Sequence, residues 1–318
     1  MGHLCPRMAA GGSARSQRDW LREHECCLKL WSGKLFPMSW KCVFACFFVL
    51  AVLAAFLYGP LFAWSPVHPG YVKLNFKRAD VLYPADRPPD PAYSEVDQYV
   101  ALAESFHNLR CSKKITVVAC RDWNDCLRFA APFLGKQRPV GVTIPTGTVI
   151  YLATPYIYGT LDVGGVLRHE LSHATLNQNR TLLSVWRLLR QPWFSEGVAG
   201  VTAGMGVTAP GHKLVALPAV DFIARARHEE LWPSFEAVPQ RDWYFSYTAW
   251  EFFWVRQIQL RGKATFLKFE SACTSEPEKC RAGFANIYGM DLRHAVEACQ
   301  DDLRSGRFVP ADRTASTP

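Results

Sequence analysis

The sequence has no internal repeat and no low-complexity tract, which excludes solenoid and fibrous architectures. A large excess of charge of one sign is also missing. Residues 1–41 hold seven Lys and Arg against three Asp and Glu, which leaves 29 basic and 25 acidic residues in the rest of the chain. This excess is too small to suggest nucleic acid as a partner, so we expect none.

After residue 64, no cysteines have the C-x-x-C spacing of a zinc knuckle, which argues against a structural metal site made of thiolates. The same part contains an even number of cysteines, which favours disulfides in an oxidising compartment. They are Cys111, Cys120, Cys126, Cys273, Cys280 and Cys299. The pairs Cys120/Cys126 and Cys273/Cys280 are close enough in sequence to form locally, although six cysteines allow many other connectivities.

Lys, Arg, Asp and Glu are absent from Cys42 to Val72. The first part of this run is almost purely apolar, as in a membrane-spanning helix of about 20 residues. Gly59-Pro60 limits the uninterrupted stretch, but Leu61 to Trp64 could continue it beyond a kink. We therefore predict a transmembrane signal-anchor helix over residues 42–64. A cleaved signal peptide is the alternative, but no small-x-small cleavage site follows the run.

The basic excess before the apolar run places the N-terminus in the cytoplasm by the positive-inside rule. Residues 1–41 are then a cytoplasmic segment, unless translation starts at Met38. The protein would be single-pass in the inner membrane, with the lipid bilayer as one partner and its folded part in the periplasm. Proline-rich residues 65–92 predict a linker, and residues 306–318 a flexible tail.

Between these segments, the sequence predicts one α+β domain over residues 93–305. Apolar residues at helical spacing predict helices over residues 94–110 and 123–133, and a β-branched run predicts a strand over residues 114–119. Residues 140–153 predict a two-stranded hairpin around Pro145-Thr-Gly147. Helical patterns follow, so strands belong to an N-terminal lobe and helices to the C-terminal part.

The segment His169-Glu170-Leu-Ser-His173 is the most informative, because residues four apart share one face of a helix. Glu170 falls between the histidine face and the core, where its carboxylate can reach a metal-bound water without being a ligand. A chain of this composition contains H-E-x-x-H by chance only about 0.01 times, which disfavours an accidental histidine pair. Val163, Leu167, Leu171 and Ala174 should face the core, while Arg168, Ser172 and Thr175 should project on another side.

Downstream, Pro192-Trp-Phe-Ser-Glu196-Gly-Val-Ala199 predicts a helix opened by proline with a carboxylate in its first turns. Together with the histidine segment, it resembles the gluzincin metallopeptidases, in particular small bacterial peptidases with paired H-E-L-x-H-A and W-x-x-E-G-x-A motifs. The resemblance covers roughly residues 140–305 and implies a zincin-like fold. It implies one Zn²⁺ per chain bound by His169, His173 and Glu196, with Glu170 as the catalytic base.

The aromatic segment Tyr244 to Trp254 resembles the helix that follows the metal motifs in that family. The likeness implies Tyr247 as a donor to the oxyanion, with Tyr244 and His212 as alternatives. It also implies that the strand Thr148 to Leu152 forms the cleft edge and pairs with a peptide or protein substrate. Two features depart from the family. Gly200 stands where some members have an acidic residue, and the missing G-x-M-E-N motif favours an endopeptidase over an aminopeptidase.

These patterns predict zinc-dependent hydrolysis of peptide bonds by a membrane-tethered, extracytoplasmic peptidase. A non-catalytic zinc-binding envelope protein that acts as a binding module is the alternative. Glu170 argues against it, because metal binding alone does not require that carboxylate. A purely structural envelope protein with an accidental motif is a third hypothesis, which metal analysis would separate from the other two.

Overall fold

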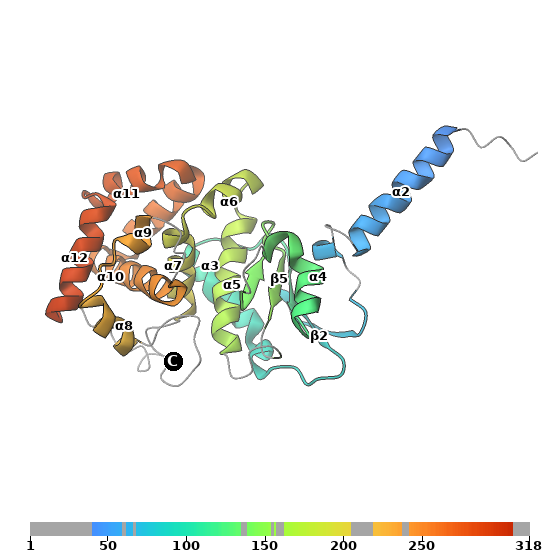
Figure 1. The fold of residues 1–318 in the computed structure, drawn as a ribbon, viewed down its shortest axis with the longest axis horizontal. Coiled ribbons are helices and arrows are strands. Elements are labelled where there is room, and N and C mark those ends of the chain that lie inside the picture. Colours follow the sequence, from blue (N-terminus) through green and yellow to red (C-terminus); the bar gives the residue numbers. More distant parts are fainter. Residues whose placement is uncertain are drawn as a thin grey trace, which may run out of the picture. The chain divides into compact units, whose positions relative to one another are not determined.

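The computed structural model describes residues 40–58, 62–65, 68–134, 139–153, 156, 162–204, 219–236 and 242–307. The chain divides into two compact units, Met1–Ala54 and Ala55–Pro318 (Figure 1). The predicted cytoplasmic segment, apart from its last two residues, lies outside the described residues. So do most of the predicted C-terminal tail and His212.

Helix α2 (Trp40–Tyr58) has the length and the apolar composition needed to cross a membrane, and none of Trp40–Leu57 is buried. The predicted extension of this helix to Trp64 is wrong. Phe62–Trp64 form a short 3-10 helix, η1, in which Phe62 is buried and its ring stacks on Phe129 at 4.7 Å. The aromatic residues that lengthen the apolar run in the sequence thus belong to the core of the folded unit.

A five-stranded mixed sheet forms the first half of the folded unit, with the order β1-β2-β3-β5-β4. Strands β2, β3 and β5 are parallel to one another, while the edge strands β1 and β4 are antiparallel to β2 and β5. The strands are β1 (Tyr71–Asn75), β2 (Ala79–Pro84), β3 (Ile115–Ala119), β4 (Gly141–Thr143) and β5 (Val149–Leu152).

The prediction of a linker over residues 65–92 is wrong, because this segment contributes β1 and β2 to the sheet. Ala79 and Val81 of β2 are fully buried. The prolines of this segment flank the strands: Pro66 and Pro69 precede β1, Pro84 is the last residue of β2, and Pro88, Pro89 and Pro91 follow it. β2 pairs with β3, which lies more than 30 residues further along the chain, and β1 pairs with β2.

Successive residues of β3 and β5 point to opposite faces of the sheet, and helices cover both faces (Figure 1). Val117 and Ile150 pack with α3 (Val96–His107) and α5 (Val163–Gln178). Val118 and Tyr151 pack on the other face with η1 and α4 (Trp123–Leu134). The predicted helices, strand and hairpin before residue 153 are confirmed.

Helices form the second half of the folded unit. They are α6 (Leu182–Leu188), α7 (Pro192–Ala203), α8 (Ala219–Ala226), α9 (Pro233–Glu236), α10 (Trp243–Ser275), α11 (Cys280–Tyr288) and α12 (Leu292–Ser305). Short 3-10 helices η2 (Pro91–Glu95) and η3 (Pro277–Lys279) precede α3 and α11. The predicted α+β arrangement, with strands first and helices after them, is confirmed.

Aromatic packing and one of two disulfides stabilise the helical half. Trp193 of α7 stacks on Trp254 of α10 at 5.6 Å, and Trp254 stacks on Phe269 at 5.3 Å, although α10 bends at Gly262, where φ is 80°. Both local disulfides predicted from the sequence are present, Cys120–Cys126 and Cys273–Cys280. The second of these joins the end of α10 to the start of α11.

Candidate metal centre

Helix α5 carries the two histidines and is buried on nearly all sides. Asp162 caps it by accepting a hydrogen bond from the Gly165 amide at 2.9 Å. The four apolar residues expected to face the core are buried, as predicted. Ser172 and Thr175 are fully buried too, because α3 and the residues after it cover their side of the helix.

Helix α7 carries Glu196 and lies unusually close to α10. A Cβ atom at Gly197 would lie 2.8 Å from both Trp250 Cβ and Trp254 Cδ1. The glycine that follows Glu196 is therefore required by helix packing. One turn later, a Cβ at Gly200 would lie 3.3 Å from Glu251 Cβ, so the buried carboxylate of Glu251 occupies the space beside the position where an acidic residue was missing.

The fold brings together His169, His173 and Glu196, which form a group that can hold a metal ion. His169 Nε2 lies 3.1 Å from Glu196 Oε2 and 3.2 Å from His173 Nε2, and His173 Nε2 lies 3.4 Å from Glu196 Oε2. Ligand atoms about 2.0 Å from a tetrahedral ion lie about 3.3 Å from one another. The three atoms therefore have the spacing of three corners of such a site.

The charges of these residues match a site for a cation. Burial alone would lower the pKa of His173, but the charge and hydrogen bond of Glu196 raise it to about 9. Burial would raise the pKa of Glu196, but His173 and His169 hold it well below its usual range. In the metal-free chain, a proton on His173 thus supplies positive charge where an ion would otherwise bind.

Glu170 lies outside this group of three ligands, and the edge strand β4 fixes its position. The Thr143 hydroxyl donates a hydrogen bond to Glu170 Oε2 at 2.7 Å. A Cβ at Gly141 would lie 2.7 Å from Glu170 Oε1, so only glycine lets the strand approach this closely. The sequence reasoning missed both residues, although the predicted hairpin puts them on the same side of a strand.

Tyr247 of α10 lies beside the three candidate metal ligands. Its ring centroid is 6.2 Å from that of His169, and its side chain is hydrogen-bonded to Glu196. Burial and the nearby Glu196 and Glu170 raise the pKa of Tyr247 well above its usual value, so the hydroxyl remains protonated and can donate. Tyr244, the alternative in the same helix, is exposed.

A second buried polar group lies behind α5, and no sequence pattern indicated it. His107 Nδ1 of α3 lies 2.6 Å from Glu270 Oε1 of α10, and His107 Nε2 lies 2.7 Å from Ser172 Oγ of α5. The order serine, histidine, carboxylate is that of a nucleophilic triad. Ser172 is fully buried, however, so this network joins three helices and offers no nucleophile to a substrate.

The cleft edge differs from the expectation. Strand β5 lies between β3 and β4, so the strand Thr148 to Leu152 is internal and β4 is the edge beside Glu170. The short antiparallel strand β4 covers β5, which the resemblance placed at the edge.

In comparisons with known proteins, no family model matches the chain and no curated protein matches it.

Proposed function

We propose that the chain is a zinc-dependent peptidase of gluzincin type. The observation that carries the proposal is the tetrahedral spacing of His169, His173 and Glu196 next to a separate carboxylate, Glu170. Two histidines and one glutamate are the ligand set of catalytic zinc sites that keep one position open. A structural zinc site would normally close that position with a fourth protein ligand, usually a cysteine.

His169, His173 and Glu196 would hold the zinc, which when bound lowers the pKa of a water ligand to about 7 and polarises the scissile carbonyl. Glu170 takes the proton of the attacking water and returns it to the leaving amine. Thr143 orients the Glu170 carboxylate for this transfer by donating to its Oε2 atom. The Tyr247 hydroxyl orients Glu196 in the resting site and donates to the oxyanion during turnover.

The substrate is a peptide or protein that binds in an extended conformation along β4. Among the described strands, β4 pairs only with β5, so its other side is available to a substrate backbone. Main-chain pairing would place a scissile bond next to Glu170, which the same strand contacts. This mode of binding requires no free terminus and therefore favours an endopeptidase.

Helix α2 tethers the peptidase to the inner membrane, with the N-terminus in the cytoplasm and the catalytic unit in the periplasm. Two disulfides in the folded unit support an oxidising compartment. The alternative, a zinc-binding module without activity, has less support, because Thr143 and Gly141 keep Glu170 in place although it is not a ligand.

Two glutamate substitutions test the proposal on the full-length chain, with a degenerate fluorogenic peptide library as substrate. Glu170→Gln should keep one zinc per chain and lower hydrolysis by about 10²- to 10⁴-fold, because it removes only the proton acceptor. Glu196→Gln should weaken zinc binding and activity together, with partial recovery at high zinc. The exposed Glu297→Gln is the matched control and should change neither.

Native mass spectrometry counts the zinc in each variant. Full zinc-dependent hydrolysis by Glu170→Gln would contradict the mechanism. Absence of zinc after reconstitution of the unsubstituted chain would contradict the assignment of the metal.

A further inference from the structure

Helix α6 lies between α5 and α7 in the chain and exposes an apolar face that does not pack against the core. Leu182, Leu183, Trp186 and Leu189 are 54, 60, 51 and 53% exposed, whereas Val185 and Leu188 are buried. The spacing of the exposed residues places them along one side of the helix. Four large apolar side chains at one place are more than the scattered exposure that is normal in a water-soluble protein.

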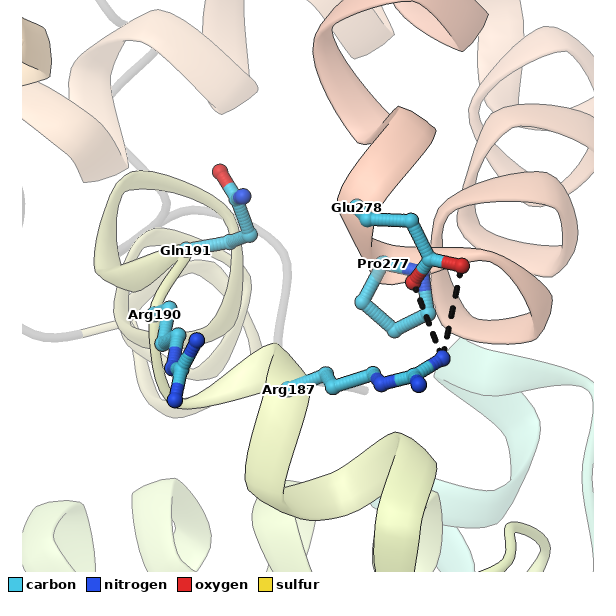
Figure 2. A pocket seen from close by; sticks show the side chains of 5 residues that line it. All are labelled: Arg187, Arg190, Gln191, Pro277 and Glu278. Carbon is cyan, nitrogen blue, oxygen red and sulfur yellow. Dashed lines mark hydrogen bonds and ion pairs between the residues drawn. The ribbon is translucent and has the colours of Figure 1, made fainter.

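Positive charge borders this face. No Asp or Glu occurs from residue 171 to residue 195, while Arg180, Arg187 and Arg190 lie in or beside α6. Figure 2 shows Arg187 directed toward Glu278, with which it makes an exposed ion pair at 3.4 Å. Arg190 makes no ion pair within the described part of the chain. Both arginines line a surface pocket of about 360 Å³ together with Gln191, Pro277 and Glu278.

We propose that α6 docks onto an anionic phospholipid surface. Leu183, Trp186 and their apolar neighbours enter the interfacial region of the bilayer, and Arg187 and Arg190 bind lipid phosphate groups. Leucine and tryptophan on one face with arginine at its border are typical of helices that lie in a membrane interface. Helix α2 is long and apolar enough to span a membrane, and as the proposed tether it would keep the folded unit near a bilayer.

Charge favours a lipid surface over a second copy of the chain. A symmetric dimer through α6 would bring the same arginine-bordered face of both copies together, so like charges would repel. An anionic bilayer supplies the opposite charge. Because α6 connects α5 to α7, docking would hold the metal centre close to the bilayer. His173 is five residues from the end of α5, which corresponds to about 8 Å along the helix axis.

Photo-crosslinking of the full-length chain in nanodiscs tests the proposal without any assay of activity. A benzophenone amino acid replaces Leu183 in one sample and Leu260 in the control, because both side chains are 60% exposed. The nanodiscs contain phosphatidylcholine with or without phosphatidylglycerol. We expect lipid adducts at position 183 to exceed those at position 260 by about tenfold when phosphatidylglycerol is present.

The double substitution Arg187→Gln and Arg190→Gln should reduce the adducts at position 183 severalfold, as should omission of phosphatidylglycerol. Both arginines are exposed, and an unchanged thermal midpoint would show that the fold is intact. Equal lipid labelling at the two positions would overturn the proposal. A main product that links position 183 to a second chain, or to another segment of the same chain, would also overturn it.

Discussion

Single residues of a neighbouring strand fix the carboxylate that we propose as the base. Gly141 leaves room for the Glu170 side chain, and the Thr143 hydroxyl donates a hydrogen bond to the Glu170 carboxylate. Neither residue is chemically reactive, so a search for catalytic side chains passes over them. The position of the Glu170 carboxylate therefore depends on the absence of a side chain at position 141.

Gly141→Ala should separate the position of Glu170 from metal binding. The new Cβ would lie 2.7 Å from Glu170 Oε1 and must displace that carboxylate, while the three ligands come from other elements. We expect kcat/KM to fall by about 10- to 100-fold with zinc content unchanged. Gly283→Ala is the matched control, because its Cβ would meet no atom within 4 Å. Full activity of Gly141→Ala would show that strand β4 does not position the base.

The metal-free chain should lose stability as the pH rises from about 6.5 to about 9. The pKa of His173 is raised from 6.5 to about 9 in the folded chain, so its contribution is complete below 6.5 and is lost as pH rises through 9. The pKa of Glu196 is lowered, so its contribution is present above the ordinary value of 4.5. Calorimetry after removal of metal by a chelator measures the thermal midpoint. His173→Gln is the control and should lack the decrease above pH 6.5.

The same shift affects metal binding, because an ion must displace the proton on His173. Zinc affinity should therefore increase with pH up to about 9 and then level off. Isothermal titration at several pH values, in buffers of different ionisation enthalpy, counts the protons released. No release at neutral pH would contradict the raised pKa of His173.

At the scale of elements, α5 is held from two sides. Strand β4 contacts it through Thr143 and Glu170, while α3 and α10 contact it through the network of Ser172, His107 and Glu270. The disulfide Cys273–Cys280 lies three residues after Glu270 and joins the end of α10 to α11. Helix α5 thus lies between an edge strand and a buried network that joins helices.

Removal of one member of this network should destabilise the fold without touching a ligand. Glu270→Ala leaves His107 without its carboxylate partner in the core, and the loss of a buried hydrogen bond to a charged group costs about 1.5–3 kcal/mol. Ser172→Ala removes one hydrogen bond to a neutral hydroxyl and should cost only about 1 kcal/mol. Chemical denaturation of both variants measures the difference. Equal and small effects would show that the network does not support α5.

For the whole molecule, we predict that the folded unit lies outside the cytoplasm. The basic residues before α2 favour this orientation, and the two disulfides favour an oxidising compartment. Alkaline phosphatase fused after Pro318 should be active, because it folds only after export. A reporter that works only in the cytoplasm should be inactive at the same point. The reverse result would contradict both the orientation of α2 and the proposed location of the folded unit.

The sequence by itself determined the features that depend on neighbours along the chain. Helical spacing predicted that His169 and His173 share a face, an uncharged apolar run predicted α2, and short separations predicted both disulfides. The position of Glu196 as a third ligand came from the resemblance of two motifs. In each case the signal is local, because a periodic pattern reports which side of its own element is buried.

Only the tertiary structure decided which distant segments meet. β1 and β2 became strands because β3 pairs with β2, and β4 became the edge beside Glu170 because it covers β5. His107 and Glu270 are 163 residues apart and yet form one buried pair. A local pattern cannot specify such partners, because the packing of the whole core selects them among many segments of similar composition.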